Sequence, residues 1–117
     1  MNKREIGKSY EKTAAAFLKE KGVRIIAQNF RCRQGEIDLI GRHGDYLVFF
    51  EVKYRSSDLA GDPAEAVDVK KQRKICRTAA YFLYQRKLGE SIPVRFDVIG
   101  ICGEQINWYQ NAFDYIE

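Results

Sequence analysis

Two short segments of the sequence place charged side chains directly beside runs of apolar residues. Residues 48–55 read VFFEVKYR, so Glu51 and Lys53 follow three apolar residues and stand two positions apart. Side chains two positions apart on a strand share a face, with about 6–7 Å between them. Residues 35–40 read GEIDLI, which puts Glu36 and Asp38 on one face of another strand. Together the segments bring three carboxylates and one ammonium group into two apolar strands.

Asp38 and Glu51 are the pair that indicates chemistry. A short turn between the two strands predicts an antiparallel hairpin that sets them roughly opposite each other. Adjacent carboxylates repel and resist joint ionisation. A divalent cation between them stabilises both, and carboxylates completed by water and a substrate phosphate are ligands that Mg²⁺ favours. With the ammonium group of Lys53 to orient water or stabilise charge, the pattern is typical of phosphodiester hydrolysis that depends on Mg²⁺ or Mn²⁺.

The alternative for Glu51 and Lys53 is a surface ion pair, which contributes only about 0–1 kcal/mol. Short motifs of this kind also arise by chance. The apolar run before Glu51 and the facing EIDLI segment favour a site over an ion pair.

Capping residues and hydrophobic periodicity predict the elements that position these side chains. A helix is expected over residues 3–21, with a capping box formed by Asn2 and Glu5 and with Gly22 at its end. An antiparallel meander of three strands follows, at residues 23–31, 36–42 and 46–55. The third strand carries apolar residues on both faces, as a central strand does.

A second helix is expected from Pro63 to about Lys87, with Asp62 as its cap. Two further strands follow, at residues 93–102 and 105–110. A right-handed crossover through the helix makes the first of them parallel to its partner. The order α-β-β-β-α-β-β therefore predicts an α/β fold, with a mixed β-sheet flanked by helices in one domain, residues 1–117.

Composition and charge narrow the function classes. No run approaches the ~20 apolar residues of a membrane span, and the N-terminus lacks an apolar signal core, so a cytoplasmic location away from membranes is expected. The net charge of +4 is compatible with a phosphate-backbone partner without demonstrating one. Three widely spaced cysteines argue against disulfides and structural zinc, and the single histidine argues against histidine-based catalysis.

The two segments and their surroundings resemble the UPF0102, or YraN, family of bacterial proteins. Besides GEIDLI and LVFFEVKYR, the matching segments are QNFRCRQGEIDLI, AEAVDVKKQRKICRTAAYFL and VRFDVIGI, together with Gly7, Glu11 and Ala14 in the first helix. The resemblance covers nearly the whole chain. That family is placed in the restriction-endonuclease-like PD-(D/E)xK superfamily, near archaeal Holliday-junction resolvases, so the resemblance implies a restriction-endonuclease-like fold.

The resemblance assigns roles by position in this sequence. Asp38 corresponds to the metal-binding aspartate, Glu51 to the second metal ligand and Lys53 to the lysine of the motif. The main-chain carbonyl of Val52 commonly completes such a metal shell. Glu11 falls where related resolvases carry an acidic residue on the first helix, close to the metal.

Three neighbouring positions qualify these assignments. Glu36 is a weaker candidate for a supporting role. Tyr10 stands where the family often has glycine before Glu11, which predicts a tighter approach to that carboxylate. Ile37 replaces the proline of the superfamily's name, a common replacement.

Basic side chains gather on two helical stretches and near the first hairpin turn. A solvated helix face is the ordinary explanation of such a run, but these cations could also follow a DNA backbone. No base-reading motif is visible, so recognition by shape is expected rather than by sequence. The residues expected to bind nucleic acid are Lys8, Arg31, Arg33, Lys70, Lys71, Arg73 and Lys74.

Three functions are therefore compared. The leading hypothesis is a metal-dependent DNA endonuclease acting on branched or damaged DNA. The others are a non-catalytic nucleic-acid-binding protein that keeps the fold, and an interaction module in which Glu51 and Lys53 form only an ion pair. Because related resolvases act as dimers, the resemblance also suggests a homodimer; Trp108, Tyr109 and Phe113 could mediate it or equally pack back on their own domain.

Overall fold

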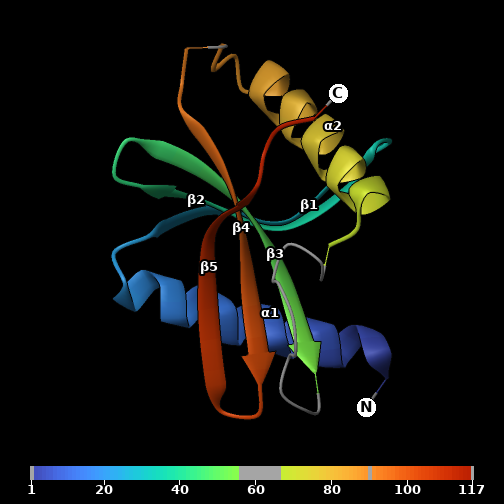
Figure 1. Ribbon diagram of the computed structural model, residues 1–117, viewed down its shortest axis with the longest axis vertical. Helices are drawn as coiled ribbons and strands as arrows, with labels where there is room; N and C mark the ends of the chain where they lie inside the picture. Colours follow the sequence, from blue (N-terminus) through green and yellow to red (C-terminus); the bar gives the residue numbers. More distant parts are fainter. Residues whose placement is uncertain (1, 56–66, 90, 117) are drawn as a thin grey trace.

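Seven helices and strands follow one another in the predicted order within the residues that the structure describes. The structure is a computed structural model, and it describes residues 2–55, 67–89 and 91–116 (Figure 1). The elements are α1 (Lys3–Glu20), β1 (Arg24–Cys32), β2 (Gly35–His43), β3 (Tyr46–Arg55), α2 (Val69–Gln85), β4 (Val94–Cys102) and β5 (Gln105–Phe113). This order confirms the predicted α/β class.

The strands form one mixed sheet in the order β1-β2-β3-β4-β5. Neighbouring strands are antiparallel except β3 and β4, which run parallel because the chain crosses over through the segment that contains α2. The predicted meander and the predicted parallel crossover are both confirmed. Figure 1 shows the strands lying between α1 and α2.

The central strand β3 supplies side chains to two cores, one on each face of the sheet. Phe50 lies on the α1 side, where it packs with Leu18 and other buried residues of α1. Phe49 lies on the α2 side, with its ring 5.9 Å from the ring of Phe82. Burying side chains of this size contributes about 1.5–3 kcal/mol each. The sheet is therefore held rigidly where β3 approaches Glu51.

Helix α1 begins at the predicted residue, Lys3, and ends at Glu20, one residue before the predicted end. The Glu5 backbone N–H donates a hydrogen bond of 2.9 Å to Asn2 Oδ1, and Asn2 is the N-cap. Gly22 follows the helix with a φ of 92°, a left-handed conformation that favours glycine. The Val23 backbone N–H donates a hydrogen bond to the Leu18 carbonyl.

The predicted start of the second helix is wrong. The described helix begins at Val69, and its N-cap is Asp68, whose Oδ1 accepts the Lys71 backbone N–H at 2.8 Å. Asp68 has extended backbone, so a continuous helix from Pro63 is excluded; Asp62 and Pro63 themselves lie outside the described residues. The helix ends at Gln85, two residues earlier than predicted.

Strand β5 reaches Phe113, three residues beyond the predicted end. Its pairing with β4 is irregular between Phe96 and Val98, which indicates a bulge, and Asn111 in this part of β5 has a positive φ of 53°. Among the described residues, no helix is long and apolar enough to cross a membrane.

Candidate functional site

The sheet opens between β2 and β3. Pairing of these strands stops at Leu39 and Phe50, whereas each strand goes on pairing with its outer neighbour beyond that point. The opening lies between residues 35–38 of β2 and residues 51–55 of β3, and we call it the fork. Asp38 and Glu51 stand on its two sides, one step beyond the last pair.

The regular alternation of β2 is interrupted at Asp38. Ile37 and Ile40 both join the core on the α2 side, although perfect alternation would put them on opposite faces. Opposite Asp38 in the register of β1 lies Asn29, which has a positive φ of 52°. The expectation that Glu36 and Asp38 share a face rested on regular alternation, and the strand departs from it at this residue.

Asp38 connects the two sides of the fork. Its Oδ2 accepts the Val52 backbone N–H at 2.8 Å. This N–H belongs to the residue between Glu51 and Lys53, so the Asp38 carboxylate lies against the backbone of the predicted motif. A side chain thus takes an N–H that could otherwise extend the ladder to β2, which accounts for the opening of the sheet.

Glu51 is a buried carboxyl in an unfavourable environment. It is 8% exposed. Its pKa is raised from 4.5 to about 8, mainly by burial and also by a hydrogen bond with Asp38 and by the negative charge of Asp38. Lys71 and, to a smaller extent, Lys53 act in the opposite direction. The buried Oε2 of Glu51 has no hydrogen-bond partner among the described residues.

Glu11 brings a further carboxyl to the fork from α1. Its pKa is raised from 4.5 to about 7, mainly by burial and also by the charges of Asp38 and Glu36, while the cations Lys8 and Arg31 act in the opposite direction. Its Oε1 is also buried without a hydrogen-bond partner in the described part of the chain. The structure therefore brings Glu11 close to Asp38, as the position-by-position comparison implied.

Tyr10, the residue before Glu11, packs away into a stack. Its ring lies 4.2 Å from the ring of Tyr54, with 12° between the ring planes. The expectation of a tighter approach to Glu11 came from this bulky residue. In the structure the ring contacts the end of β3 instead.

The basic residues border the site on both sides. Arg31 Nε lies 3.4 Å from Glu36 Oε1, which holds one predicted DNA-binding cation near the acidic group. Arg33 is exposed in the turn after β1. Gly35, the first residue of β2, packs so closely on α2 that a methyl group on it would approach Thr78 Oγ1 to 3.1 Å and Lys74 Cβ to 3.7 Å. The start of β2 and the middle of α2 therefore lie side by side. The exposed cations before this point of α2 are Lys70, Arg73 and Lys74.

Lys71 has a contact that the sequence interpretation did not assign to it. It was grouped with the DNA-binding cations, but its Nζ lies 3.6 Å from Glu51 Oε2. A signal was present in the helix periodicity, because Lys71 precedes the buried Ile75 by four residues and so lies on the face that packs on the sheet. Only the packing of that helix face against the end of β3 identifies Glu51 as the partner of Lys71.

The fork fits a cation held partly by the protein. Two buried carboxylate oxygens without hydrogen-bond partners, on Glu11 and Glu51, lie near Asp38, and a divalent cation would satisfy them. No group of three or more His, Cys, Asp or Glu side chains in residues 2–55, 67–89 and 91–116 is arranged to hold a metal. Asp38 and Glu51 are donors of the kind that Mg²⁺ uses, since it usually binds one or two carboxylates and keeps several waters.

Asp97 forms a second buried charged group that the sequence interpretation missed. It is fully buried, pairs with Arg95 at 2.9 Å, and accepts hydrogen bonds of 2.8 Å from Trp108 Nε1 and from the Asn111 N–H. Its hydrogen bonds hold β5 onto β4 at the bulge, which is a structural role. Trp108 and the buried Phe113 thus pack on their own domain.

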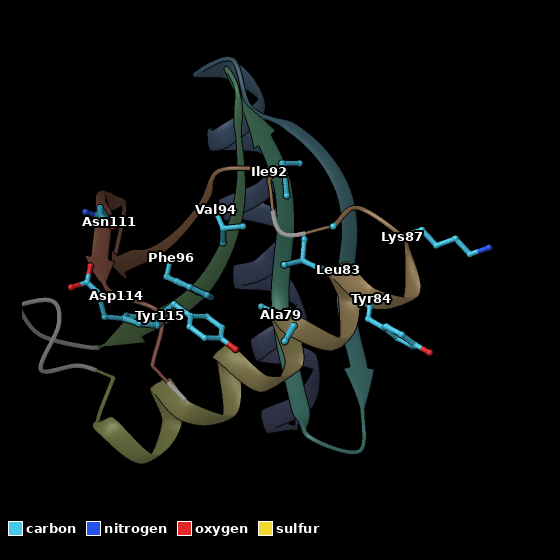
Figure 2. Close-up of a pocket in the computed structure, with 13 residues that line it drawn as sticks. Ala79, Leu83, Tyr84, Lys87, Ile92, Val94, Phe96, Asn111, Asp114 and Tyr115 are labelled. Carbon is cyan, nitrogen blue, oxygen red and sulfur yellow. The ribbon is translucent and has the colours of Figure 1, made fainter.

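An apolar groove of about 840 Å³ lies between the second half of α2, the start of β4 and the end of β5. Figure 2 shows Leu83, Ile92 and Phe96 pointing into it, while Lys87 points away. Leu83 stands about 18 Å from Lys71 along the helix, at 1.5 Å per residue. None of the candidate residues lines the groove, so it is separate from the fork.

Comparison with known proteins gives matches over almost the whole chain. The model of the uncharacterised protein family UPF0102 matches residues 10–101. A UPF0102 protein of Lachnoclostridium phytofermentans is 49% identical over 114 residues, which cover 97% of each chain. A UPF0102 protein of Vibrio campbellii is 46% identical, covering 95% of this chain and 93% of its own, and one of Legionella pneumophila (strain Corby) is 42% identical, covering 94% and 95%.

Proposed function

The chain belongs to the UPF0102 family, and we propose that it is a metal-dependent DNA endonuclease that hydrolyses phosphodiester bonds in branched or damaged DNA. We place this activity in the cytoplasm, with DNA recognised by its shape. A homodimer would let two strands be cut symmetrically.

Each residue at the fork has a part in this proposal. Asp38 and Glu51 would hold Mg²⁺ or Mn²⁺, with the main-chain oxygen of Val52 and with Glu11 as further ligands. When bound, the cation supplies positive charge that neutralises the carboxylates and polarises the phosphodiester. Lys53 donates a hydrogen bond that orients the attacking water toward phosphorus.

The observation that carries the proposal is the pair of buried carboxylate oxygens, Glu51 Oε2 and Glu11 Oε1, that lack hydrogen-bond partners among the described residues. Both carboxyls have a pKa raised by burial and by the charge of Asp38, so ionising them side by side costs free energy unless positive charge is supplied. A folding role alone gives no reason to gather such groups around Asp38. A cation site does.

A cleavage assay tests the proposal. Supercoiled, single-stranded, flapped and four-way-junction DNA are incubated with Mg²⁺, Mn²⁺ or EDTA, using wild type, Asp38→Asn and Glu51→Gln. We expect metal-dependent cutting by wild type only, with DNA binding retained by Asp38→Asn. Wild type that binds the junction in each condition but never cuts would refute the nuclease.

A non-catalytic DNA-binding protein is the second candidate. It needs only exposed cations such as Lys70, Arg73 and Lys74 of α2, which could bind a DNA backbone without any metal. DNA binding that does not respond to any metal would support this candidate. Absence of DNA binding even at low salt would instead indicate the interaction module.

A further inference from the structure

We propose that Lys71 connects the metal site to the DNA-binding surface: without metal its ammonium group pairs with Glu51, and once Glu51 binds a divalent cation the same group moves to a phosphate oxygen of the substrate. The inference rests on the proposed function and adds to it the location of the substrate phosphate, at the N-terminal end of α2.

The contact between Lys71 and Glu51 is close enough for an ion pair but does not complete a hydrogen bond. Nζ lies 3.6 Å from Oε2, and that oxygen has no hydrogen-bond partner among the described residues. The Lys71 side chain is 43% exposed, whereas that of Glu51 is 9% exposed. Lys71 can therefore swing toward solvent at little cost, while Glu51 has to stay in the fork.

The position of Lys71 in α2 gives its released ammonium group a second partner. It is the third residue of the helix, at the end where the helix dipole favours an anion; its own backbone N–H already donates to Asp68 Oδ1. Lys70, Arg73 and Lys74 are exposed on the same half of the helix. A phosphate at this end of α2 would lie between those exposed cations and the fork.

Lys53 and Lys71 then have different tasks. Lys53 belongs to β3, whose backbone is fixed by pairing with β4, so the Cα of Lys53 is held in place. Lys71 belongs to the other element that borders Glu51, and it opposes the rise in the Glu51 pKa more strongly than Lys53 does. Glu51 therefore has a mobile cation as its nearest partner and a fixed one beside it.

The test compares Lys71→Met with Lys70→Met, a control one residue along the same helix that removes the same charge from an exposed position. Binding of a labelled four-way junction is measured in EDTA and in Ca²⁺, and Ca²⁺ binding to each protein alone is measured by calorimetry. Thermal unfolding checks that both variants fold.

We expect Lys71→Met to weaken junction binding about five- to tenfold in Ca²⁺, the loss of one charged phosphate contact, and by less than about twofold in EDTA. Lys70→Met should weaken binding equally in both conditions. Lys71→Met should also bind Ca²⁺ more tightly than wild type, because a competing cation has been removed.

Equal effects of Lys71→Met with and without Ca²⁺ would overturn this inference and leave the proposed nuclease standing. Wild type that binds no Ca²⁺, Mg²⁺ or Mn²⁺ would overturn the proposed function and the inference together. The two failures are thus distinguishable.

Discussion

Replacing Glu51 with glutamine should stabilise the metal-free protein at alkaline pH. The glutamine amide has the shape of the protonated carboxyl and can likewise donate to Asp38, but it never ionises. Most buried-site substitutions destabilise a protein, so a gain in stability is a demanding expectation.

The sign follows from the pKa of Glu51. In the folded protein the carboxyl keeps its proton up to about pH 8, whereas in the unfolded chain it loses the proton near 4.5. Between these values the folded state binds more protons, so the free energy of unfolding of wild type falls as pH rises. Each pKa unit corresponds to about 1.4 kcal/mol, so the full loss is about 5 kcal/mol and is complete above pH 8.

Urea denaturation in EDTA at pH 5, 7 and 9 measures this loss. At pH 9 we expect Glu51→Gln to exceed wild type by at least about 2 kcal/mol, and at pH 5 by less than about 1 kcal/mol. Glu104→Gln, an exposed carboxylate in the turn before β5, is the matched control and should stay within about 0.5 kcal/mol at each pH. If Glu51→Gln were no more stable than wild type at pH 9, Glu51 would not be the costly charge described above.

Two further expectations concern metal binding and packing. Mg²⁺ affinity measured by calorimetry should rise from pH 6 to about pH 8, because the cation then has fewer protons to displace from Glu11 and Glu51. Asp38→Asn should abolish most of the Mg²⁺ binding. Gly41→Ala should destabilise the protein in urea by about 1–3 kcal/mol, because its methyl group would lie 2.7 Å from Val23 Cγ1, whereas Gly7→Ala in α1, which meets no atom within 4 Å, should stabilise it by about 0.5–1 kcal/mol.

Local signals predicted most of the fold. Asn2 caps α1, and the continuous apolar run of residues 47–50 marks β3 as a strand buried on both faces; both signals lie within a few residues. The start of α2 was placed wrongly because Asp62 and Asp68 both have the chemistry of a cap. Only the extended backbone of Asp68 and its bond to Lys71 decide which one begins the described helix.

The site was predictable where its residues share a strand or a hairpin. Asp38, Glu51 and Lys53 were singled out as candidates by their spacing, and the role of Glu11 came from the family resemblance. The pairing of Lys71 with Glu51 and the network around Asp97 were not, because each depends on where distant elements meet. Helix periodicity places Lys71 on the inner face of α2, but it does not say which strand end lies beneath it.

The fork is the place where the fold departs from its own local rules. Asp38 interrupts the alternation of β2 and takes a backbone N–H from β3, so the ladder that would close the sheet is lost. Glu51 is buried, and burial is the main reason that its pKa rises to about 8. Its closest cation is the half-exposed Lys71, at 3.6 Å. A sequence shaped only by stability would do better with glutamine there, by the reasoning applied above. Ionised carboxylates become favourable at this position only when positive charge is added beside them, which is what the proposed cation would do.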